Sequence, residues 1–350
     1  MIDVLVVEDS PVIREFLVHT LSSDPKIRVI GTAANGEEAL EQIRKKKPDL
    51  ITMDIHMPKM DGFEATRRIM ETYPVPIIII SGSSTGDEVA TTFRALEMGA
   101  LTVIPRPNGI GHPMYEATAK ELVQTVKLMS EVKVVKRWAR PVTAATTRPS
   151  PAGAAGVERA PARIGIVAIG ASTGGPQALQ TVLSGLPEDF PAPVLVVQHI
   201  APGFLQGLVE WLAGSCALPV RIAGHGETLQ PGQVYIAPDG FQMGVRRGGI
   251  IVLSQDETEN NHCPSVSCLF RTVAEAYGRN AAGVLLTGMG KDGAEELRLM
   301  KERGAVTIAQ DAQSSIVHGM PGEAIRLEAA VHVLAPERIA AALTGLVKKR

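Results

Sequence analysis

A serine lies between glycines where an apolar segment gives way to a helix-forming one. Residues 170–175 read Gly-Ala-Ser-Thr-Gly-Gly, after the apolar run Ile164–Ile169 and before a helix start at Pro176. Glycines permit the tight turn that would expose the Ser172 hydroxyl for nucleophilic attack. The N-terminus of the following helix would offer N–H groups to a developing negative charge. A phosphate-binding turn or a structural turn would fit this spacing about as well, so a catalytic serine needs partners.

A nucleophilic serine requires a base and a carboxylate that orients the base. His199 directly follows the predicted strand Val194–Gln198, and Asp292 follows the predicted strand Ala282–Leu286. The carboxyl ends of parallel strands meet at one sheet edge, so Ser172, His199 and Asp292 are predicted to converge there. Other histidines of this half are rival bases, but they do not directly follow a clear predicted strand: His225, His262, His318 and His332.

A second group of polar residues lies in the N-terminal half, again where predicted strands end. Glu8 and Asp9 follow the first strand, Asp54 follows the third, and Ser81 and Arg106 follow the fourth and fifth. Gathered carboxylates repel one another unless a cation is bound, and oxygen ligands suit Mg²⁺. Beside a metal, an aspartate can accept a phosphoryl group as a nucleophile. Capping of the next helix would explain Glu8 and Asp9 but leaves Asp54 without a role.

The elements that must position these residues alternate along the N-terminal half. Apolar runs are predicted to be strands at Val4–Val7, Arg28–Thr32, Leu50–Met53, Ile77–Ile80 and Leu101–Ile104. Each is followed by a predicted helix, at Pro11–Leu21, Glu37–Lys46, Gly62–Glu71, Glu88–Met98 and Tyr115–Val134. Apolar strands without alternation, separated by helices, indicate a parallel sheet covered on both faces. The N-terminal half is therefore predicted to be a five-stranded parallel α/β domain.

The C-terminal half repeats this alternation with one irregular region. Strands are predicted at Ile164–Ile169, Val194–Gln198, Ala282–Leu286 and Val306–Ala309, and helices at Pro176–Leu183, Phe204–Ala213, Val266–Tyr277 and Ile339–Lys348. Gly226–Leu253 holds short apolar segments between glycine turns, which is typical of hairpins. We expect a doubly wound, mainly parallel α/β domain with added β-hairpins.

The two halves are joined by a segment rich in Ala, Pro and Thr. Residues 139–162 contain four prolines and show neither helical nor strand periodicity. Such a composition buries too little apolar surface to order itself, which favours a flexible linker. The predicted organisation is a domain over residues 1–135, a linker over 136–162 and a second domain over 163–348.

Composition argues against several classes of protein. The 350 residues suit two domains, and a formal net charge of −2 argues against nucleic-acid binding. Apolar runs fall short of the ~20 residues of a membrane span, and the N-terminus lacks the basic segment of a secretory signal. The cysteines are odd in number and lack paired spacing, which disfavours a disulfide framework or a zinc site: Cys216, Cys263 and Cys268. We expect a cytoplasmic protein without membrane insertion.

One competing interpretation comes from the loop Gly288-x-Gly290-x-x-Gly293, which formally matches a dinucleotide-binding fingerprint. It follows a predicted strand, and Asp311 lies about 20 residues downstream, where a ribose ligand would sit. The match falls late in the domain, however, and puts Asp292 where a pyrophosphate would approach. A nicotinamide-dependent oxidoreductase is therefore the weaker prediction, and the glycines can instead direct backbone N–H groups at an oxyanion.

The N-terminal half, from residue 1 to about residue 125, resembles a response-regulator receiver domain, which has a flavodoxin-like fold. Residues 53–62, Met-Asp-Ile-His-Met-Pro-Lys-Met-Asp-Gly, are very similar to the phosphorylation loop of that family. The resemblance implies that Asp54 accepts the phosphoryl group. It also implies Mg²⁺ ligands and switch residues: Glu8, Asp9, Asp54 and the backbone carbonyl of His56 for the metal, and Ser81 and Arg106 for the switch.

Two positions depart from the receiver pattern. Arg106 stands where the family usually has Lys, and Val103 stands where it usually has an aromatic switch residue. Arginine keeps the positive charge, but its planar fork differs from a point ammonium, and valine cannot swing as a bulky aromatic does. We therefore expect phosphorylation of Asp54 with altered coupling to the second domain.

Residues 163–345 resemble the catalytic domain of protein-glutamate methylesterases of bacterial chemosensory pathways. The matching segments are residues 169–175, 198–199, 202–204, 235–238, 264–266, 286–293 and 319–321. The resemblance implies a triad of Ser172, His199 and Asp292, with Met289 and Thr173 at the oxyanion or substrate. Cys263 and Ser267 stand where the family often has Arg and Asp, which bears on substrate preference.

The activity implied is hydrolysis of glutamate γ-methyl esters on chemoreceptors, with deamidation of glutamines, through an acyl-enzyme. The implied partners are methylated cytoplasmic regions of chemoreceptors as substrate and a sensor histidine kinase as phosphodonor. The receiver is expected to bind Mg²⁺ and to cover the triad until Asp54 is phosphorylated, whereas the catalytic domain needs no cofactor. We expect a monomer that acts in chemosensory adaptation. The alternative from another class is a receiver-linked regulator that binds receptors without catalysis.

Overall fold

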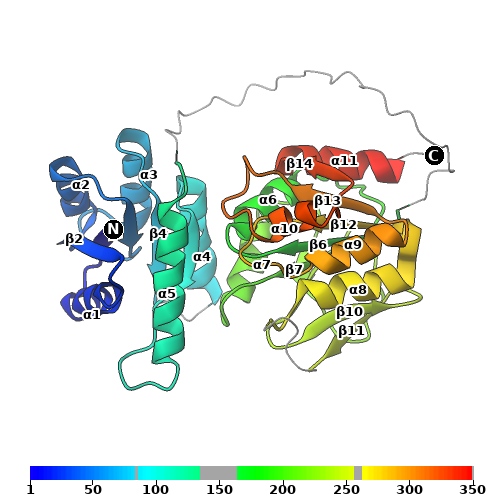
Figure 1. The fold of residues 1–350 in the computed structure, drawn as a ribbon, viewed down its shortest axis with the longest axis horizontal. Coiled ribbons are helices and arrows are strands. Elements are labelled where there is room, and N and C mark those ends of the chain that lie inside the picture. Colours follow the sequence, from blue (N-terminus) through cyan, green and yellow to red (C-terminus); the bar gives the residue numbers. More distant parts are fainter. Residues whose placement is uncertain (83–85, 135–163, 256–261, 349–350) are drawn as a thin grey trace.

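The computed structural model describes residues 1–82, 86–134, 164–255 and 262–348. The predicted linker, residues 136–162, lies outside these ranges. Two α/β domains stand side by side, the N-terminal one in blue and cyan and the C-terminal one in green to red (Figure 1). No helix in the described ranges is long and apolar enough to cross a membrane.

The N-terminal domain is built around a parallel sheet with the strand order β2-β1-β3-β4-β5. The strands are β1 (Ile2–Val7), β2 (Ile27–Ala33), β3 (Leu50–Met53), β4 (Ile77–Ser81) and β5 (Thr102–Pro105). β3 and β4 are buried along their whole length, as expected where helices cover both faces of a sheet. The predicted five-stranded fold is confirmed, and β1 pairs with β3, so the residues that follow these two strands are neighbours.

All the helices predicted for this domain are present: α1 (Pro11–Ser22), α2 (Gly36–Lys45), α3 (Gly62–Thr72), α4 (Gly86–Met98) and α5 (Tyr115–Ser130). The side chains of Ser10, Asn35 and Asp61 accept hydrogen bonds from the first turns of α1, α2 and α3. α5 ends at Ser130 rather than at Val134 as predicted. The Ser130 hydroxyl donates to the Lys127 carbonyl (2.9 Å), and such local bonds compete with continuation of a helix.

The C-terminal domain holds a seven-stranded sheet in which every neighbouring pair is parallel, with the order β14-β13-β12-β6-β7-β9-β8. Its strands are β6 (Ile166–Ala171), β7 (Val194–Gln198), β8 (Val220–Ile222), β9 (Val234–Ile236), β12 (Ala281–Leu285), β13 (Val306–Gln310) and β14 (His332–Leu334). The central strands β12, β6 and β7 are fully buried. The carboxyl ends of these three strands therefore lie side by side at one edge.

The irregular region 226–253 contains one hairpin, formed by β10 (Gln242–Arg246) and β11 (Ile250–Ser254). β9, from the same region, joins the main sheet instead, because Val234, Tyr235 and Ile236 are fully buried and pair in parallel with β7 and β8. The helices of this domain are α6 (Gly175–Ser184), α7 (Leu205–Ala213), α8 (Val266–Tyr277), α9 (Ala294–Glu302), α10 (Met320–Arg326) and α11 (Pro336–Lys348). A mainly parallel, doubly wound domain is confirmed.

The two domains meet through an apolar contact between α4 and α7 (Figure 1). The ring of Phe93 on α4 stacks on that of Trp211 on α7, with centroids 5.8 Å apart, and the Trp211 indole N–H donates to the Glu97 carboxylate (2.9 Å). The Gln177 carboxamide on α6 donates to the Ala100 carbonyl (2.6 Å). Phe93 and Trp211 belong to one continuous hydrophobic core that crosses the boundary. Buried aromatic side chains therefore contribute to the stability of this contact.

Candidate active site and receiver centre

Ser172 is the first residue after β6, at the start of the short loop that leads into α6. Its backbone N–H donates to the Thr287 carbonyl (3.0 Å), and its own carbonyl accepts from the Gly175 N–H (2.8 Å). These two bonds fix the loop and leave the Ser172 side chain half-exposed. The hydroxyl therefore stands at the carboxyl edge of the sheet, between β12 on one side and β7 on the other.

His199 follows β7 and contacts Asp292, which lies in the loop between β12 and α9. His199 Nε2 lies 2.9 Å from Asp292 Oδ2, and Asp292 is 2 % exposed. Burial alone would raise the pKa of Asp292. Hydrogen bonds from His199 and Ser267 and from the Val266 backbone outweigh burial and lower this pKa to about 2. Asp292 is therefore an ionised partner of the imidazole at neutral pH.

The other ring nitrogen of His199 is still available. Nδ1 is buried and has no hydrogen-bond partner among the described residues. Since Nε2 is held by Asp292, Nδ1 is the nitrogen that could exchange a proton with a serine. His199 and Ser172 line the same cavity, so the structure brings all three sequence-predicted residues to one edge of one sheet.

That cavity has a volume of about 420 Å³ and lies between the two domains. Its catalytic-domain lining consists of Ser172, Thr173, Pro176, Gln198, His199, Ile200, Ala201, Pro202, His262, Met289 and Gly290. Its receiver lining comes from α4, β5 and α5: Phe93, Thr102, Val103, Ile104, Pro105, Glu121, Gln124, Thr125 and Leu128. The N-terminal domain therefore covers the cavity that Ser172 lines.

The predicted oxyanion residues also lie at this cavity. Met289 is 45 % exposed, and its backbone N–H donates no hydrogen bond to any part of the chain that the structure describes. Thr173 follows the serine, and its carbonyl accepts from the Thr287 hydroxyl (2.9 Å). The free N–H of Met289 is a donor that a reacting carbonyl oxygen could use.

The glycine loop that resembled a dinucleotide fingerprint serves this site. A Cβ on Gly288 would lie 2.7 Å from Ser172 Cβ and would also collide with Met320 Sδ, so glycine allows the loop to approach the serine closely. The same loop carries Asp292, whose carboxylate is committed to His199 and to the N–H groups of Val266 and Ser267. The arrangement fits an orienting carboxylate and not a pyrophosphate cradle.

Sequence reasoning missed two residues of the site. Gln198 Nε2 donates to the carbonyls of both Ser172 (2.8 Å) and His199 (2.7 Å), so one carboxamide ties the two backbones together. The ring of His262 stacks on that of His199, with centroids 3.9 Å apart and planes 10° apart. Nothing in the local sequence signals either contact. From the sequence, Gln198 is visible as the end of a strand and within the matching segment 198–199, and His262 as a rival base.

The two departures from the family near Pro264 differ in their surroundings. Ser267 is fully buried, and its hydroxyl donates to Glu296 (2.6 Å) and accepts from the Gly293 N–H (3.0 Å), so it braces the Asp292 loop. Burial raises the pKa of the Cys263 thiol, which disfavours a reactive thiolate there. Neither residue lines the cavity at Ser172.

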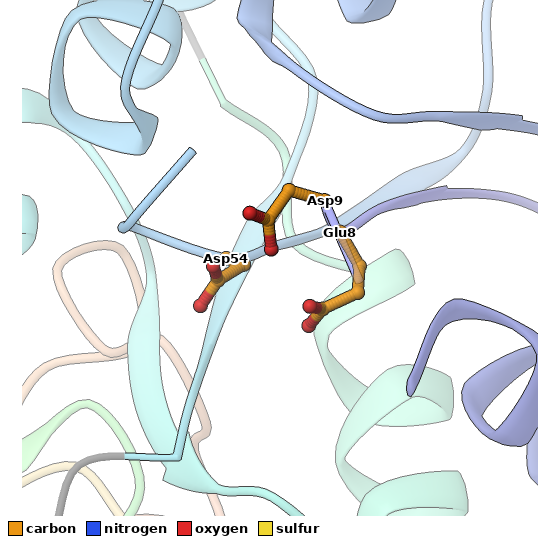
Figure 2. A group of neighbouring side chains, drawn as sticks. All are labelled: Glu8, Asp9 and Asp54. Carbon is orange, nitrogen blue, oxygen red and sulfur yellow. The ribbon is translucent and has the colours of Figure 1, made fainter. Parts of the chain in front are cut away.

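The N-terminal domain gathers three carboxylates at the ends of β1 and β3. Figure 2 shows Glu8, Asp9 and Asp54 together, and one oxygen from each lies within 4.8 Å of the others. Glu8 and Asp54 are buried, whereas Asp9 is exposed. Burial and the charge of Asp54 raise the pKa of Glu8 to about 7, and burial also raises that of Asp54.

These residues fit a divalent cation. Glu8 Oε2 is buried and has no hydrogen-bond partner in the described ranges, as expected of an atom meant for a ligand. A site made only of carboxylate oxygens, open on the Asp9 side, suits Mg²⁺. His56, whose backbone carbonyl was also predicted as a ligand, lies in the same loop after Asp54.

The predicted switch residues lie beside this cluster. Ser81, the last residue of β4, is buried, and its carbonyl accepts from the Arg106 N–H (2.8 Å). The Arg106 guanidinium lies 3.6 Å from Glu8 Oε2 and covers Gly82. Val103, which replaces the usual aromatic residue, lines the cavity at Ser172 instead. Strand β5 therefore connects Arg106, beside the carboxylate cluster, with Val103, which lines the cavity.

Comparison with known proteins covers both domains of the chain. The family model described as CheB methylesterase matches residues 167–343, and the response regulator receiver domain model matches residues 4–112. A protein-glutamate methylesterase/protein-glutamine glutaminase from Nitrosospira multiformis is 59 % identical over 350 residues, covering 100 % of this chain and 98 % of its own. A relative of the same name from Geobacter metallireducens is 55 % identical and is covered completely.

A solved structure supports the fold of the second domain. The crystal structure of the Thermotoga maritima CheB methylesterase catalytic domain matches with a TM-score of 0.51 and 40 % identity, covering 52 % of this chain and 98 % of that one. Fold, motifs and full-length relatives agree. The chain belongs to the CheB methylesterase family, in the form in which a response regulator receiver domain precedes the methylesterase domain.

Proposed function

We propose that this protein hydrolyses glutamate γ-methyl esters, and deamidates glutamines, on chemoreceptors during chemosensory adaptation. The names of its relatives support both activities. The observation that carries the proposal is the 2.9 Å contact between His199 and buried Asp292, in a cavity that Ser172 also lines. We further propose the domain limits 1–135 and 163–348.

The proposed reaction is acyl transfer from the substrate to water. His199 takes the Ser172 proton at Nδ1, the ring nitrogen without a partner, while Asp292 holds Nε2 and stabilises the imidazolium that forms. Ser172 Oγ attacks the side-chain carbonyl carbon. His199 then returns the proton to the leaving methanol or ammonia. Water, activated by the same imidazole, cleaves the ester on Ser172 and releases glutamate.

Charge that develops on the carbonyl oxygen needs donors in place before the reaction. The Met289 N–H is free in the described structure and points to this role, and Thr173 adjoins the nucleophile on the other side. A non-catalytic receptor-binding protein would have no use for such a donor beside a serine. Methanol release from methylated receptor separates the two functions.

The receiver is proposed to control this site through phosphorylation of Asp54 by a sensor histidine kinase. Glu8, Asp9, Asp54 and the His56 carbonyl would hold Mg²⁺, which neutralises the charge of an incoming phosphoryl group. Arg106 already contacts Glu8 and can redirect its guanidinium to a phosphate. Arg106 directly follows β5, and Val103 within β5 lines the cavity. A shift of β5 would therefore move the part of the receiver that covers Ser172.

Replacing Asp54 by asparagine should remove this control. Beryllofluoride mimics an aspartyl phosphate, so it should raise methanol release by the unchanged protein and leave the Asp54→Asn variant at its basal rate. The amide cannot form the same bond to phosphorus or beryllium. Asp61→Asn is the matched control, since asparagine keeps the capping role of Asp61 on α3 and the response should persist. An equal response in both variants would contradict control through Asp54.

Added side-chain volume at the contact between the two domains should raise the rate of methanol release without phosphodonor. Gly207 on α7 packs directly on α4, and a Cβ there would lie 2.6 Å from the Ala90 backbone nitrogen. Gly207→Ala therefore pushes the domains apart, while alanine favours α7 itself. Overpacking of this kind costs roughly 1–3 kcal/mol, so we expect basal methanol release to rise about fivefold or more.

Gly345→Ala is the control for the Gly207→Ala substitution. Gly345 lies in α11, another helix of the same domain, and a Cβ there meets nothing within 4 Å. Methanol release without phosphodonor should match that of the unchanged protein. If Gly207→Ala also leaves the basal rate unchanged, the receiver does not restrict access to Ser172.

A further inference from the structure

The imidazole of His262 lies flat against that of His199. Their centroids are 3.9 Å apart and their planes differ by 10°, so the rings are in contact over their faces. His262 comes from the segment before α8, whereas His199 follows β7, so the pair is made by the tertiary fold. Both rings line the cavity at Ser172.

His262 is anchored independently of His199. Its carbonyl accepts from Gln242 Nε2 (2.9 Å), and Gln242 Oε1 accepts from the Ser265 N–H (2.8 Å). Gln242 belongs to β10 and is 3 % exposed. One buried carboxamide therefore holds the backbone from which the His262 ring extends, so this ring can serve as a packing surface for His199.

His199 needs such a surface. Its hydrogen bond to Asp292 fixes one point of the ring, at Nε2, and a single contact lets the ring pivot. Nδ1 has no hydrogen-bond partner within the described ranges that could stop this rotation. A proton transfer requires Nδ1 and the serine oxygen to keep a narrow geometry, and small misplacements are costly.

The stacked partner must also tolerate the charge that appears on His199. Burial lowers the pKa of His262, and the charge of His199 lowers it further against the opposing charge of Asp292, so the surroundings favour the neutral form of His262. A neutral ring packed face to face restrains an imidazolium without repelling it.

We propose that His262 is a positioning residue that holds the ring plane of His199, so that Nδ1 faces Ser172. This rests on the function proposed above, in which Nδ1 takes the serine proton. His262 itself exchanges no proton in the reaction. Its contribution comes from its flat face, and another flat, uncharged ring should replace it.

The test compares His262→Ala with His262→Phe in the full chain. Loss of the stack in His262→Ala should lower kcat for methanol release about tenfold and leave KM unchanged, because the proposed role of the ring is to orient the base and not to bind substrate. His262→Phe keeps a flat ring without a titratable nitrogen and should recover kcat to within about threefold. The rate at which a small organophosphonate modifies Ser172 should follow the same order, since this reaction needs the base but no receptor.

His225→Ala is the control, because His225 is an exposed histidine that bonds to Leu253 and does not line the cavity. Its kcat should match that of the unchanged protein. Three results would overturn the proposal: an unchanged kcat in His262→Ala, an equal loss in the Ala and Phe variants, or a change confined to KM. If the unchanged protein releases no methanol and its Ser172 does not react, the proposed function itself fails instead.

Discussion

Methanol release should fall on the order of 10⁵-fold when Ser172 is replaced by alanine, since no other atom replaces the attacking oxygen. The fold should persist, because the hydrogen bonds that Ser172 makes with Thr287, Gly175 and Gln198 use its backbone, which alanine keeps. The measurement is methanol released from methylated receptor over time, with thermal unfolding recorded on the same sample. A residual rate from oxyanion stabilisation is expected, as other serine hydrolases retain one.

Ser184→Ala provides the matched control for this loss. Ser184 lies at the opposite end of α6 and is exposed, and its hydroxyl bonds only to the Thr181 carbonyl among the described residues. Removing that hydroxyl should leave methanol release unchanged. Substantial activity in the Ser172→Ala variant would remove this residue from the mechanism and revive the non-catalytic alternative.

The second large effect is expected for Asp292→Asn, with a loss in kcat on the order of 10⁴-fold. The amide is close in shape to the carboxylate, but it carries no charge to stabilise the His199 imidazolium. It can also present an N–H to Nε2, which stabilises the wrong tautomer of the imidazole. Nδ1 would then carry the proton and could not accept another from Ser172. Single-turnover kinetics on methylated receptor would separate this effect from weaker substrate binding.

The same substitution should change how stability depends on pH. The pKa of Asp292 is about 2 in the folded protein and 3.8 for the ordinary side chain, so the folded state favours the carboxylate. The resulting stability is fully present above the unfolded pKa and is lost as pH falls toward 2. A shift of this size corresponds to about 2 kcal/mol. Thermal unfolding across this acidic range should show less pH dependence in Asp292→Asn, whereas exposed Asp189→Asn should behave as the unchanged protein.

Much of the fold and of the candidate site could be predicted from local sequence patterns. Apolar runs without alternation predicted the central strands, and the polar residues just after them were predicted to face one edge. Strand direction is the physical reason, since parallel strands place their carboxyl ends together whatever their order. This reasoning predicted Ser172, His199 and Asp292 at one sheet edge; in the structure Ser172 and His199 line one cavity, and Asp292 contacts His199. It also selected the cluster of Glu8, Asp9 and Asp54.

The same patterns could not predict short or irregular elements. The pattern predicts β9 as part of a hairpin, because three apolar residues between turns carry no periodicity that separates a parallel strand from an antiparallel one. β8 and β14 were not predicted for the same reason, as each has only three residues. The position of each of these short strands in the sheet depends on which neighbouring strand it pairs with.

The amino-acid sequence predicts which side chains react and the sheet edge at which they lie. The tertiary structure alone decided how those groups are held: which nitrogen of His199 meets Asp292, how Gln198 joins two backbones, and how His262 packs on the base. It also decided that β5 and α5 of the receiver cover the cavity. Strand ends are set by local chain direction, whereas these contacts join segments far apart in sequence and depend on the packing of whole elements.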